Sequence, residues 1–441
     1  MTSKPATGHI GRVVVGAALT GFISVLLLAA APFIPAEESA VTGAVLLGFA
    51  VGWATLALLS VRFTDQPQRW AWAPALFLGL GGLLLVTLGS SVHEVLGWLW
   101  PPALLVLVGW MVVQARRHLR SSSRRWVLYP VFAFMVLAAV GGGYETVSAA
   151  TASSVAMPGR LVDVNGHRLH LSCTGSGSPT VVLQPGGGEM SSNMGWIAPR
   201  VAADTRVCVY DRPGRGWSDP VSNPQDATDI AHDLHTLLHR AGVPGPYVFA
   251  GHSFGGLYVL TYAALYPEDV AGLVVVDTTP PRDAPTTGST ADPDSYDLMG
   301  RVSTLASTTS QLGITRLESL GEARTLPPQS QKEARASLAT GENFRSFIDE
   351  FAQANASMGE AAALTDLGDK PLYVLTAGDG SDAELIATHE RLAGLSTNSV
   401  HSIVKGASHE ELIVDEHDSE ATTQAILHVV AAVRDSTPLT E

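Results

Sequence analysis

The chain has 441 residues, a net charge of −14, 46% hydrophobic residues and a mean hydropathy of +0.21. This apolar content is too high for an ordinary soluble enzyme, and it is unevenly distributed. Residues 1–150 hold five acidic and nine Lys or Arg side chains, whereas residues 151–441 hold 36 acidic and 18 basic ones. Phosphate backbones would repel so acidic a second part, which argues against nucleic acid as a partner.

Residues 1–143 are predicted to form a five-helix transmembrane region. Four stretches are apolar over about 20 residues, the length that crosses a hydrocarbon core of roughly 30 Å. A fifth is shorter but continues through three glycines toward Ala149. The stretches lie near Ile10–Ile34, Ala40–Val61, Ala71–Leu88, Val95–Gln114 and Val127–Val140. Because further spans follow the first and no small-residue cleavage site stands out, we interpret the first as a span rather than a signal peptide.

The charges of the short loops predict the orientation of this region. Basic residues occur in alternate loops: Lys4 and Arg12, then Arg62 and Arg69, then Arg116, Arg117, Arg120, Arg124 and Arg125. The intervening loops carry Glu37 and Glu38, then His93 and Glu94, without Lys or Arg. A cytoplasmic N-terminus with five spans puts every basic loop in the cytoplasm and the rest of the chain outside it. Since the spans contain almost no ionisable residues, we expect an anchor or a partner-binding bundle rather than an ion path.

Residues 144–158, rich in Ala, Ser and Thr, are predicted to be a tether, and residues 159–435 a globular domain. From residue 159, short β-rich runs alternate with helical stretches, which predicts a mainly parallel sheet covered on both faces. A hairpin at Gly159–Cys173 should turn at Asn165-Gly166, a dipeptide favoured in two-residue turns. Further strands are expected at Thr180–Gln184, Thr205–Tyr210, Tyr247–Ala250, Gly272–Asp277, Pro371–Ala377 and Ser399–Val404, and helices at Asp229–Ala241, Gly255–Tyr266, Ala383–Ala393 and Ala421–Val433.

The pentapeptide Gly251-His252-Ser253-Phe254-Gly255 lies between a predicted buried strand and a predicted helix. A serine there sits on a strained turn that exposes its hydroxyl and aims the helix N-terminus at it. A Cβ on either flanking glycine would crowd the neighbouring strand and helix. Ordinary Gly and Ser abundance often produces this pentapeptide by chance, but its place between this strand and this helix predicts that Ser253 is a nucleophile.

A nucleophilic serine needs a general base and a carboxylate that orients it. His409 follows the last predicted strand and comes after Ser253 and the candidate acids, the chain order in which such triads occur. The acid is expected just past Pro371–Ala377, where Asp379 and Asp382 both occur. We favour Asp382, because Asp379 falls early for the usual turn length. Asp277, at the end of an earlier strand, is the less common alternative.

The oxyanion of an acyl-transfer intermediate needs two backbone N–H donors. Phe254, directly after the nucleophile, is expected to supply one of them. Gly187, in the glycine-rich loop after Thr180–Gln184, is expected to supply the other, because glycines let a backbone approach the reacting centre closely. We expect His252 to pack beside the nucleophile and to point away from its hydroxyl.

From about Gly159 to Val433 the sequence resembles the α/β-hydrolase superfamily, in particular its proline-iminopeptidase-like and esterase-like members. The resemblance lies in Val181–Gly187, Tyr210–Asp219, Gly251–Gly255, Gly272–Asp277 and Gly406–His409. It implies an α/β-hydrolase fold with a mostly parallel eight-stranded sheet, a helical lid insertion at about 278–370, and a structural role for Asp211 and Arg212. The lid is expected to be helical around Ser330–Leu338 and Phe344–Ala354.

The resemblance has one departure and one consequence for the two cysteines. Gln184-Pro185 stand where the family often has His-Gly, so the resemblance does not identify which backbone amide lines the oxyanion hole. The family's strand order makes the second and fourth strands neighbours, and these carry Cys173 and Cys208. A disulfide in an oxidising compartment and two buried free thiols both remain open.

These features predict a membrane-anchored serine hydrolase that cleaves an ester, amide or peptide bond through an acyl-enzyme. The substrate is expected to be a small-molecule or lipid-like carbonyl compound, and no cofactor or metal is implied. Two alternatives remain. The same residues would serve an acyltransferase acting on a membrane or envelope acceptor, and the fold could be a catalytically silent scaffold for binding or sensing.

Overall fold

A computed structural model describes residues 10–35, 37–119, 128–152, 155–221, 223–282, 298–316, 321, 323–337 and 340–440. It divides into two compact units. The helical unit comprises residues 1–151 and 292–316, and the sheet unit comprises residues 152–291 and 317–441. Several residues used in the sequence-based predictions lie outside the described residues: Lys4, Arg120, Arg124, Arg125, Val127 and Leu338.

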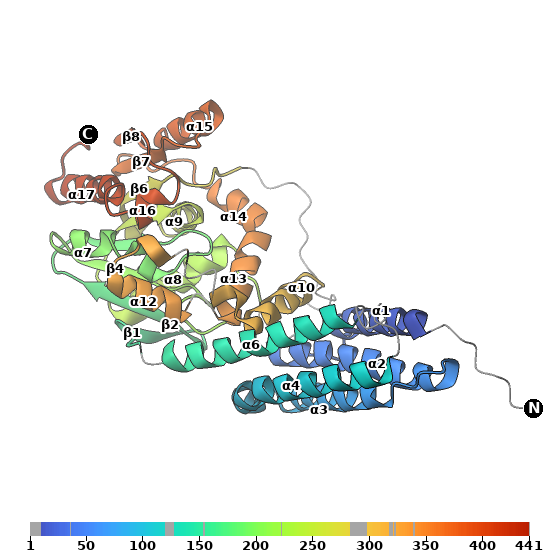
Figure 1. Cartoon of the computed structure of the whole chain (residues 1–441). Helices are drawn as coiled ribbons and strands as arrows, with labels where there is room; N and C mark the ends of the chain where they lie inside the picture. Colours follow the sequence, from blue (N-terminus) through green and yellow to red (C-terminus); the bar gives the residue numbers. More distant parts are fainter. Residues whose placement is uncertain are drawn as a thin grey trace, which may run out of the picture. The chain divides into compact units, whose positions relative to one another are not determined.

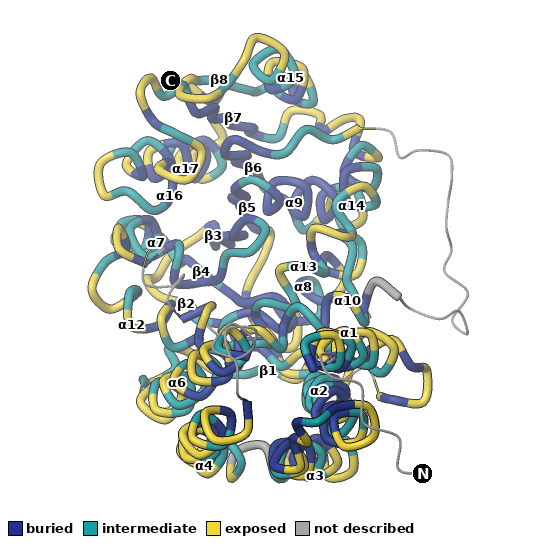
Figure 2. The backbone as a smooth tube through the Cα atoms, turned by 45° about the vertical axis from the view of Figure 1, so that its right-hand side comes forward, coloured by how far each residue is buried: buried dark blue, intermediate teal, exposed yellow. Residues whose placement is uncertain are grey.

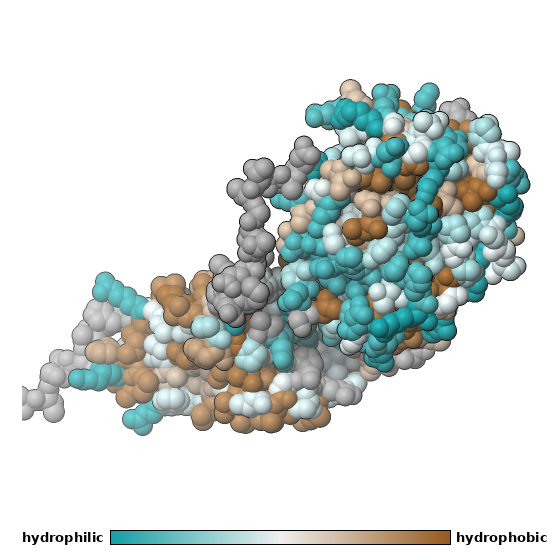
Figure 3. Space-filling model, turned by 180° about the vertical axis from the view of Figure 1, so that it is seen from behind, coloured by the Kyte–Doolittle hydropathy of each residue, from teal (hydrophilic) through white to brown (hydrophobic). Residues whose placement is uncertain are grey.

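Among the described residues, five helices of the helical unit are long and apolar enough to cross a membrane. The helices of this unit are α1 (Ile10–Ala29), α2 (Glu38–Phe63), η1 (Arg69–Ala71), α3 (Trp72–Leu88), α4 (Ser90–His118), α6 (Tyr129–Ala152), α10 (Leu298–Ser307) and η4 (Thr308–Leu312) (Figure 1). Large apolar side chains such as Leu27, Phe33 and Val106 are 67–75% exposed, and Figure 3 shows the unit's surface as largely hydrophobic. Five apolar helices of this kind confirm the predicted composition of a membrane region.

The structural units differ from the predicted domain boundaries in two ways. Helix α6 continues to Ala152, into the expected tether, because the alanines of this segment favour helix. Helices α10 and η4, which lie within the expected lid, pack within the helical unit rather than the sheet unit. Arg301 of α10 donates to the main-chain carbonyls of Ala29 (3.3 Å), the last residue of α1, and of Ile34 (2.7 Å), which follows α1. Arg316 forms an ion pair with Glu145 near the end of α6 (2.8 Å).

The sheet unit contains an eight-stranded sheet with the strand order β1-β2-β4-β3-β5-β6-β7-β8 (Figure 2). β2 pairs antiparallel with both β1 and β4, and the other neighbours are parallel. This order confirms the predicted α/β-hydrolase fold with a mostly parallel sheet. The strands are β1 (Arg160–Val164), β2 (His167–Thr174), β3 (Thr180–Gln184), β4 (Val207–Tyr210), β5 (Tyr247–His252), β6 (Val270–Val276), β7 (Leu372–Ala377) and β8 (Ser399–Val404).

Helices cover both faces of the sheet, so its central strands are buried throughout (Figure 2). Side chains alternate along each strand, so Phe249 of β5 packs on one face and Val248 on the other. Helices α8, α9, α14 and α15 contribute to the hydrophobic core on the Phe249 face of the sheet. Helices α7, α16 and α17 contribute to the core on the Val248 face. The helices of this unit are η2 (Ser191–Met194), α7 (Ile197–Ala202), α8 (Ala227–Ala241), α9 (Phe254–Leu265), η3 (Pro267–Asp269), η5 (Ala323–Thr325), α12 (Pro328–Ser337), α13 (Gly341–Ala352), α14 (Ala354–Ala361), α15 (Ala383–Ala393), α16 (Glu411–Val414) and α17 (Ser419–Asp435).

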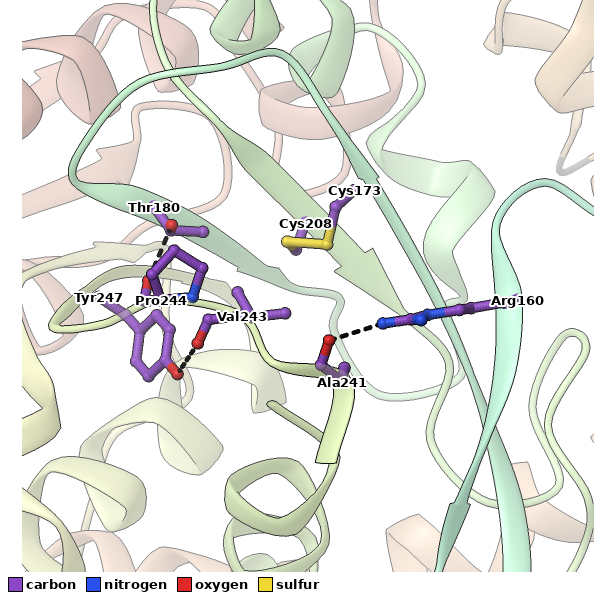
Figure 4. Close-up of a disulfide and its surroundings, with 8 residues drawn as sticks. All are labelled: Arg160, Cys173, Thr180, Cys208, Ala241, Val243, Pro244 and Tyr247. Atoms are coloured by element: carbon purple, nitrogen blue, oxygen red, sulfur yellow. Dashed lines mark hydrogen bonds between the residues drawn. A yellow bond between two sulfur atoms is a disulfide. The ribbon is translucent and has the colours of Figure 1, made fainter. Parts of the chain in front are cut away.

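The β1–β2 hairpin follows from the local sequence, and the adjacent disulfide follows from the pairing register of β2 and β4. The hairpin turns at Asn165 (φ 55°) and Gly166 (φ 102°), where both residues adopt the positive φ that this turn requires. Cys173 of β2 lies opposite Cys208 of β4, and the two form a disulfide (Figure 4). Of the two states that the sequence left open, the structure therefore has the disulfide.

Candidate active site

Ser253 occupies the strained turn between β5 and α9. Its backbone has φ 54° and ψ −121°, a conformation that an L-residue rarely adopts. A Cβ on Gly251 would lie 2.3 Å from the Gly255 carbonyl oxygen, and one on Gly255 would lie 2.3 Å from the Gln184 carbonyl oxygen. Both glycines are therefore required by the close approach of backbone segments, as expected.

The turn is fastened to the end of β6. The Ser253 amide donates to the Val276 carbonyl (3.0 Å), and the Thr278 hydroxyl donates to the Ser253 carbonyl (2.9 Å). Asp277 lies between these two partners, directly after β6. Because β5 and β6 are parallel neighbours, their carboxyl ends meet at one edge of the sheet, and this edge holds both Ser253 and Asp277.

His409 is hydrogen-bonded to Asp277. The Nδ1 of His409 lies 2.6 Å from Asp277 Oδ2, while Asp277 Oδ1 accepts from the Ala377 amide at 3.0 Å. Burial by itself would raise the pKa of the Asp277 carboxyl, but the hydrogen bonds from His409 and Ala377 outweigh burial and hold that pKa below its ordinary value. An ionised Asp277 requires a proton on His409 Nδ1, which leaves Nε2 of the neutral ring as the basic nitrogen.

The expectation that Asp382 orients His409 is corrected by this geometry. Asp382 is exposed and caps helix α15, where its side chain accepts from the Leu385 amide at 2.8 Å. An N-cap carboxylate satisfies the free amides of the first helical turn, which is why an aspartate occurs there. Asp379, the second candidate, is also exposed. Asp277, the less common alternative, is the carboxylate that contacts His409.

His252, directly before Ser253, links two other parts of the site. Its Nε2 lies 3.0 Å from the His409 carbonyl oxygen, and its Nδ1 lies 3.2 Å from a Glu189 carboxylate oxygen. Burial opposes protonation of His252, but Glu189 outweighs burial and raises the pKa of His252. Burial likewise opposes ionisation of Glu189, and His252 lowers the pKa of that carboxyl. The two side chains therefore form a buried ion pair beside the nucleophile.

In the loop after β3, the Gly187 amide differs in its hydrogen bonding from the amides on either side of it. The Gly186 amide donates to Glu189 Oε2 (2.5 Å), and the Gly188 amide donates to Glu350 Oε2 (2.8 Å). Among the described residues, the Gly187 amide between them has no hydrogen-bond partner. A Cβ on Gly187 would lie 2.9 Å from the Phe254 ring, so the two residues expected to bind an oxyanion are neighbours. Phe254 begins α9, and first-turn amides have no acceptor within their own helix.

Arg212 supports the glycine-rich loop after β3 through contacts that the sequence did not predict. Its guanidinium donates to the Pro185 (2.7 Å) and Gly186 (2.6 Å) carbonyls and to Glu350 Oε1 (2.6 Å). Both Arg212 and Glu350 are buried. The expected structural role of Arg212 is thus the support of the glycine-rich loop. Glu350, on lid helix α13, lies far from this loop in sequence. Its position in an amphipathic helix did not predict the contact.

Aromatic side chains line the space next to Gly187 and Phe254. The Phe254 ring lies 5.0 Å from that of Phe351, which in turn lies 4.7 Å from that of Phe347, measured between centroids. Phe347 and Phe351 belong to α13 and are 40% and 48% exposed, respectively. The lid therefore presents an accessible apolar surface beside the nucleophile turn.

Known proteins resemble part of this chain in sequence. A family model described as the alpha/beta hydrolase fold matches residues 179–358. An uncharacterized protein of Schizosaccharomyces pombe is 34% identical over 156 residues, which cover 28% of this chain and 29% of that protein. A Cupriavidus pinatubonensis protein named 2-hydroxy-6-oxononadienedioate/2-hydroxy-6-oxononatrienedioate hydrolase is 33% identical over 116 residues, which cover 25% of this chain and 39% of that protein. The chain thus spans less than half the length of these relatives.

Solved structures also resemble part of the chain. A thermophilic esterase from Thermogutta terrifontis is 22% identical, with a TM-score of 0.45. The match covers 62% of this chain and 99% of the esterase.

Proposed function

We propose that the chain is a membrane-anchored serine hydrolase of the α/β-hydrolase family, with Ser253 as its nucleophile. The observation that carries the proposal is the 2.6 Å hydrogen bond between His409 and Asp277, at the edge of the sheet that holds the Ser253 turn. A carboxylate in that place keeps the imidazole in the tautomer whose Nε2 accepts a proton. The Cupriavidus pinatubonensis relative that is named as a hydrolase supports the reaction class.

The proposed reaction proceeds through an acyl-enzyme. His409 Nε2 takes the proton of the Ser253 hydroxyl while Oγ attacks the carbonyl carbon of an ester. The amides of Gly187 and Phe254 bind the oxyanion of the tetrahedral intermediate. The intermediate collapses, and the alcohol leaves with the proton from His409. Water then loses a proton to His409 and attacks the acyl group, and Ser253 recovers its proton as the acid departs.

Esters with an apolar acyl or alcohol group are the proposed substrates. The rings of Phe254, Phe347 and Phe351 form an apolar surface next to the proposed oxyanion site, and a hydrocarbon group would bury it. A membrane anchor also favours lipid-like substrates, because it holds the enzyme where such molecules concentrate. Amides and lactones share the same carbonyl chemistry and are the first compounds to compare with esters.

We further propose that the sheet unit lies outside the cytoplasm. Three observations support this orientation: the basic residues of alternate loops, the Cys173–Cys208 disulfide, and the packing of residues 298–316. Arg301 contacts the end of the first span at Ala29, and Arg316 contacts the end of the fifth at Glu145. With five spans, both of these ends face the same side of the membrane.

Labelling with a fluorophosphonate probe tests the nucleophile. The full-length protein in native membranes should be labelled, and Ser253→Ala should lose the label. Ser381→Ala, in the loop before α15, is the matched control and should be labelled like the parent. A Ser253→Ala variant that is still labelled would refute the proposed function. A parent protein that is not labelled, although its resistance to trypsin shows that it is folded, would also refute it.

Reporter fusions test the orientation. Alkaline phosphatase is active only when exported, so a C-terminal fusion should be active and a fusion after Leu119, between the fourth and fifth spans, should be inactive. The reverse pattern would place the sheet unit in the cytoplasm.

A further inference from the structure

Two histidines and an aspartate converge on the surface of the sheet unit, away from the nucleophile turn. His235 and His239 lie on α8, and Asp269 ends the short helix η3. The Nε2 of His235 and the Nε2 of His239 lie 3.5 Å and 3.8 Å from the same oxygen, Oδ2 of Asp269. The ligand atoms of all three residues lie within 4.8 Å of one another. We propose that these residues form a binding site for a transition-metal ion, for which Zn²⁺ is the natural occupant.

The spacing of the histidines suits this role. Residues four apart in a helix lie on the same face, and a His-x-x-x-His pair on a helix is a recurrent way to hold zinc. Here the pair belongs to His235-Thr236-Leu237-Leu238-His239. Leu237 and Leu238, between the two histidines, are fully buried and fix α8 against the core. The residue after the first histidine is threonine rather than the glutamate of zinc proteases, so the ion would have no neighbouring general base.

The distances match a metal better than direct hydrogen bonds. Zinc bonds histidine nitrogen and carboxylate oxygen at about 2.0–2.2 Å in a tetrahedron, whose edges are therefore about 3.3–3.5 Å long. The observed separations of 3.5 Å and 3.8 Å are at or slightly beyond this edge, whereas N–H···O hydrogen bonds are normally shorter than about 3.2 Å. Small rotations of the exposed His239 ring would close the remaining gap. Water would complete the four-coordinate shell.

Neighbouring groups hold the three side chains in place. The His235 ring stacks on Tyr266 with centroids 3.9 Å apart and an interplanar angle of 7°. The Tyr262 hydroxyl donates to Asp269 Oδ2 at 3.1 Å, the kind of outer contact that orients a ligating carboxylate. Lys370 donates to the main-chain carbonyl of Val270 at 2.8 Å and so braces the end of η3.

The ion would act structurally rather than in catalysis. Asp269 precedes the amino end of β6, and Asp277 follows its carboxyl end. A strand of seven residues separates the two by about 23 Å at about 3.3 Å per residue. The site instead ties α8 to the connection between α9 and β6. This inference does not depend on the proposed function.

Zinc titration of the full-length protein tests the site. The protein carries a tag without histidine, is treated with a chelator in detergent, and is titrated with ZnCl₂ in a calorimeter. We expect one Zn²⁺ per chain with a dissociation constant below 1 mM, and a visible absorption spectrum typical of tetrahedral Co²⁺ when cobalt replaces zinc. His239→Gln and Asp269→Asn should each lose at least about tenfold in affinity, because losing a ligand costs at least as much as losing an outer contact.

Two controls separate this site from non-specific binding and from misfolding. His232→Gln changes the histidine one turn earlier on α8, which contacts Tyr266 rather than Asp269, and should keep the parent affinity. All variants should keep the parent Tm without metal and the parent fluorophosphonate labelling. Parent-like zinc affinity in folded His239→Gln, an equal loss in His232→Gln, or no binding below 1 mM would overturn the proposal.

Discussion

Glu350 of lid helix α13 accepts a hydrogen bond from the Gly188 amide at 2.8 Å, and so attaches the lid directly to the loop that carries Gly187. The second oxygen of the same carboxylate accepts from Arg212, which also holds the Pro185 and Gly186 carbonyls of that loop. Burial opposes ionisation of Glu350, but Arg212 and Arg215 outweigh burial and lower the pKa of the carboxyl. The lid and the proposed oxyanion loop therefore share one buried ionic centre.

Replacing Glu350 with Gln should destabilise the sheet unit and disorder the oxyanion loop. Removing one member of a buried ion pair costs about 3–5 kcal/mol, because it leaves the other charge unpaired, which lowers the Tm by about 10 °C in a domain of this size. Thermal unfolding in detergent measures the effect. Asp163→Asn, which removes the exposed pair with Arg240, is the control and should change the Tm by no more than about 2–3 °C. Equal shifts in both variants would contradict the buried role of Glu350.

Asp277→Asn should lower kcat by about 10⁴-fold with little change in the fold. An amide in this place stabilises the wrong tautomer of His409 and does not stabilise the imidazolium that forms during the reaction. Ester hydrolysis by the purified full-length protein measures the loss. Asp382→Asn and Asp379→Asn are matched controls at exposed positions and should retain parent activity. Full activity of Asp277→Asn, or a comparable loss in Asp382→Asn, would show that the acid is assigned incorrectly.

The ion pair between His252 and Glu189 should make stability depend on pH. The pKa of His252 is raised, so its contribution is complete below its ordinary value of about 6.5 and is lost as pH rises through the raised pKa. The pKa of Glu189 is lowered, so its contribution is present above about 4.3 and is lost as pH falls through the lowered pKa. Glu189→Gln should therefore lower the Tm most at about pH 5–6, and by less as the pH increases.

Thermal unfolding of the parent and Glu189→Gln between pH 5 and pH 9 measures this difference. Glu384→Gln, which replaces an exposed carboxylate on α15, is the control and should leave the pH profile unchanged. A difference between parent and Glu189→Gln that stays constant over the range would contradict a protonated His252.

The disulfide should contribute measurably to stability. Cys173 and Cys208 are 35 residues apart, and closing a loop of that length stabilises a fold by about 3–4 kcal/mol in the chain-entropy model. The double variant Cys173→Ala/Cys208→Ala should therefore unfold at a Tm lower by about 10 °C. Alkylation gives an independent measure: the unreduced protein, denatured to expose its sulfur atoms, should carry no reactive thiol, and the reduced protein should carry two. Two thiols alkylated without reductant would contradict the disulfide.

Local sequence determined several features, because the forces that produce them act within a few residues. The length of apolar runs predicted the five spans, and Asn165-Gly166 predicted the first hairpin turn. The Gly251–Gly255 turn was recognisable because a buried strand precedes it and an apolar helix follows it. Ser253 could be proposed from this turn, His409 from its place after the last predicted strand and after Ser253 in the chain, and Gly187 and Phe254 from their places relative to β3 and Ser253.

The tertiary structure decided which carboxylate contacts His409, what holds the glycine-rich loop, and where residues 298–316 pack. Asp277 and Asp382 follow different parallel strands, whose carboxyl ends reach the same edge of the sheet, so sequence spacing cannot choose between them. The choice depends on long-range geometry: Asp277 is buried with the Ala377 amide on one oxygen, whereas Asp382 is exposed and caps α15. Glu350 and Gly188 are 162 residues apart, so no local sequence pattern predicts their contact. Contacts between distant segments arise from strand order and helix packing, which residue propensities do not encode.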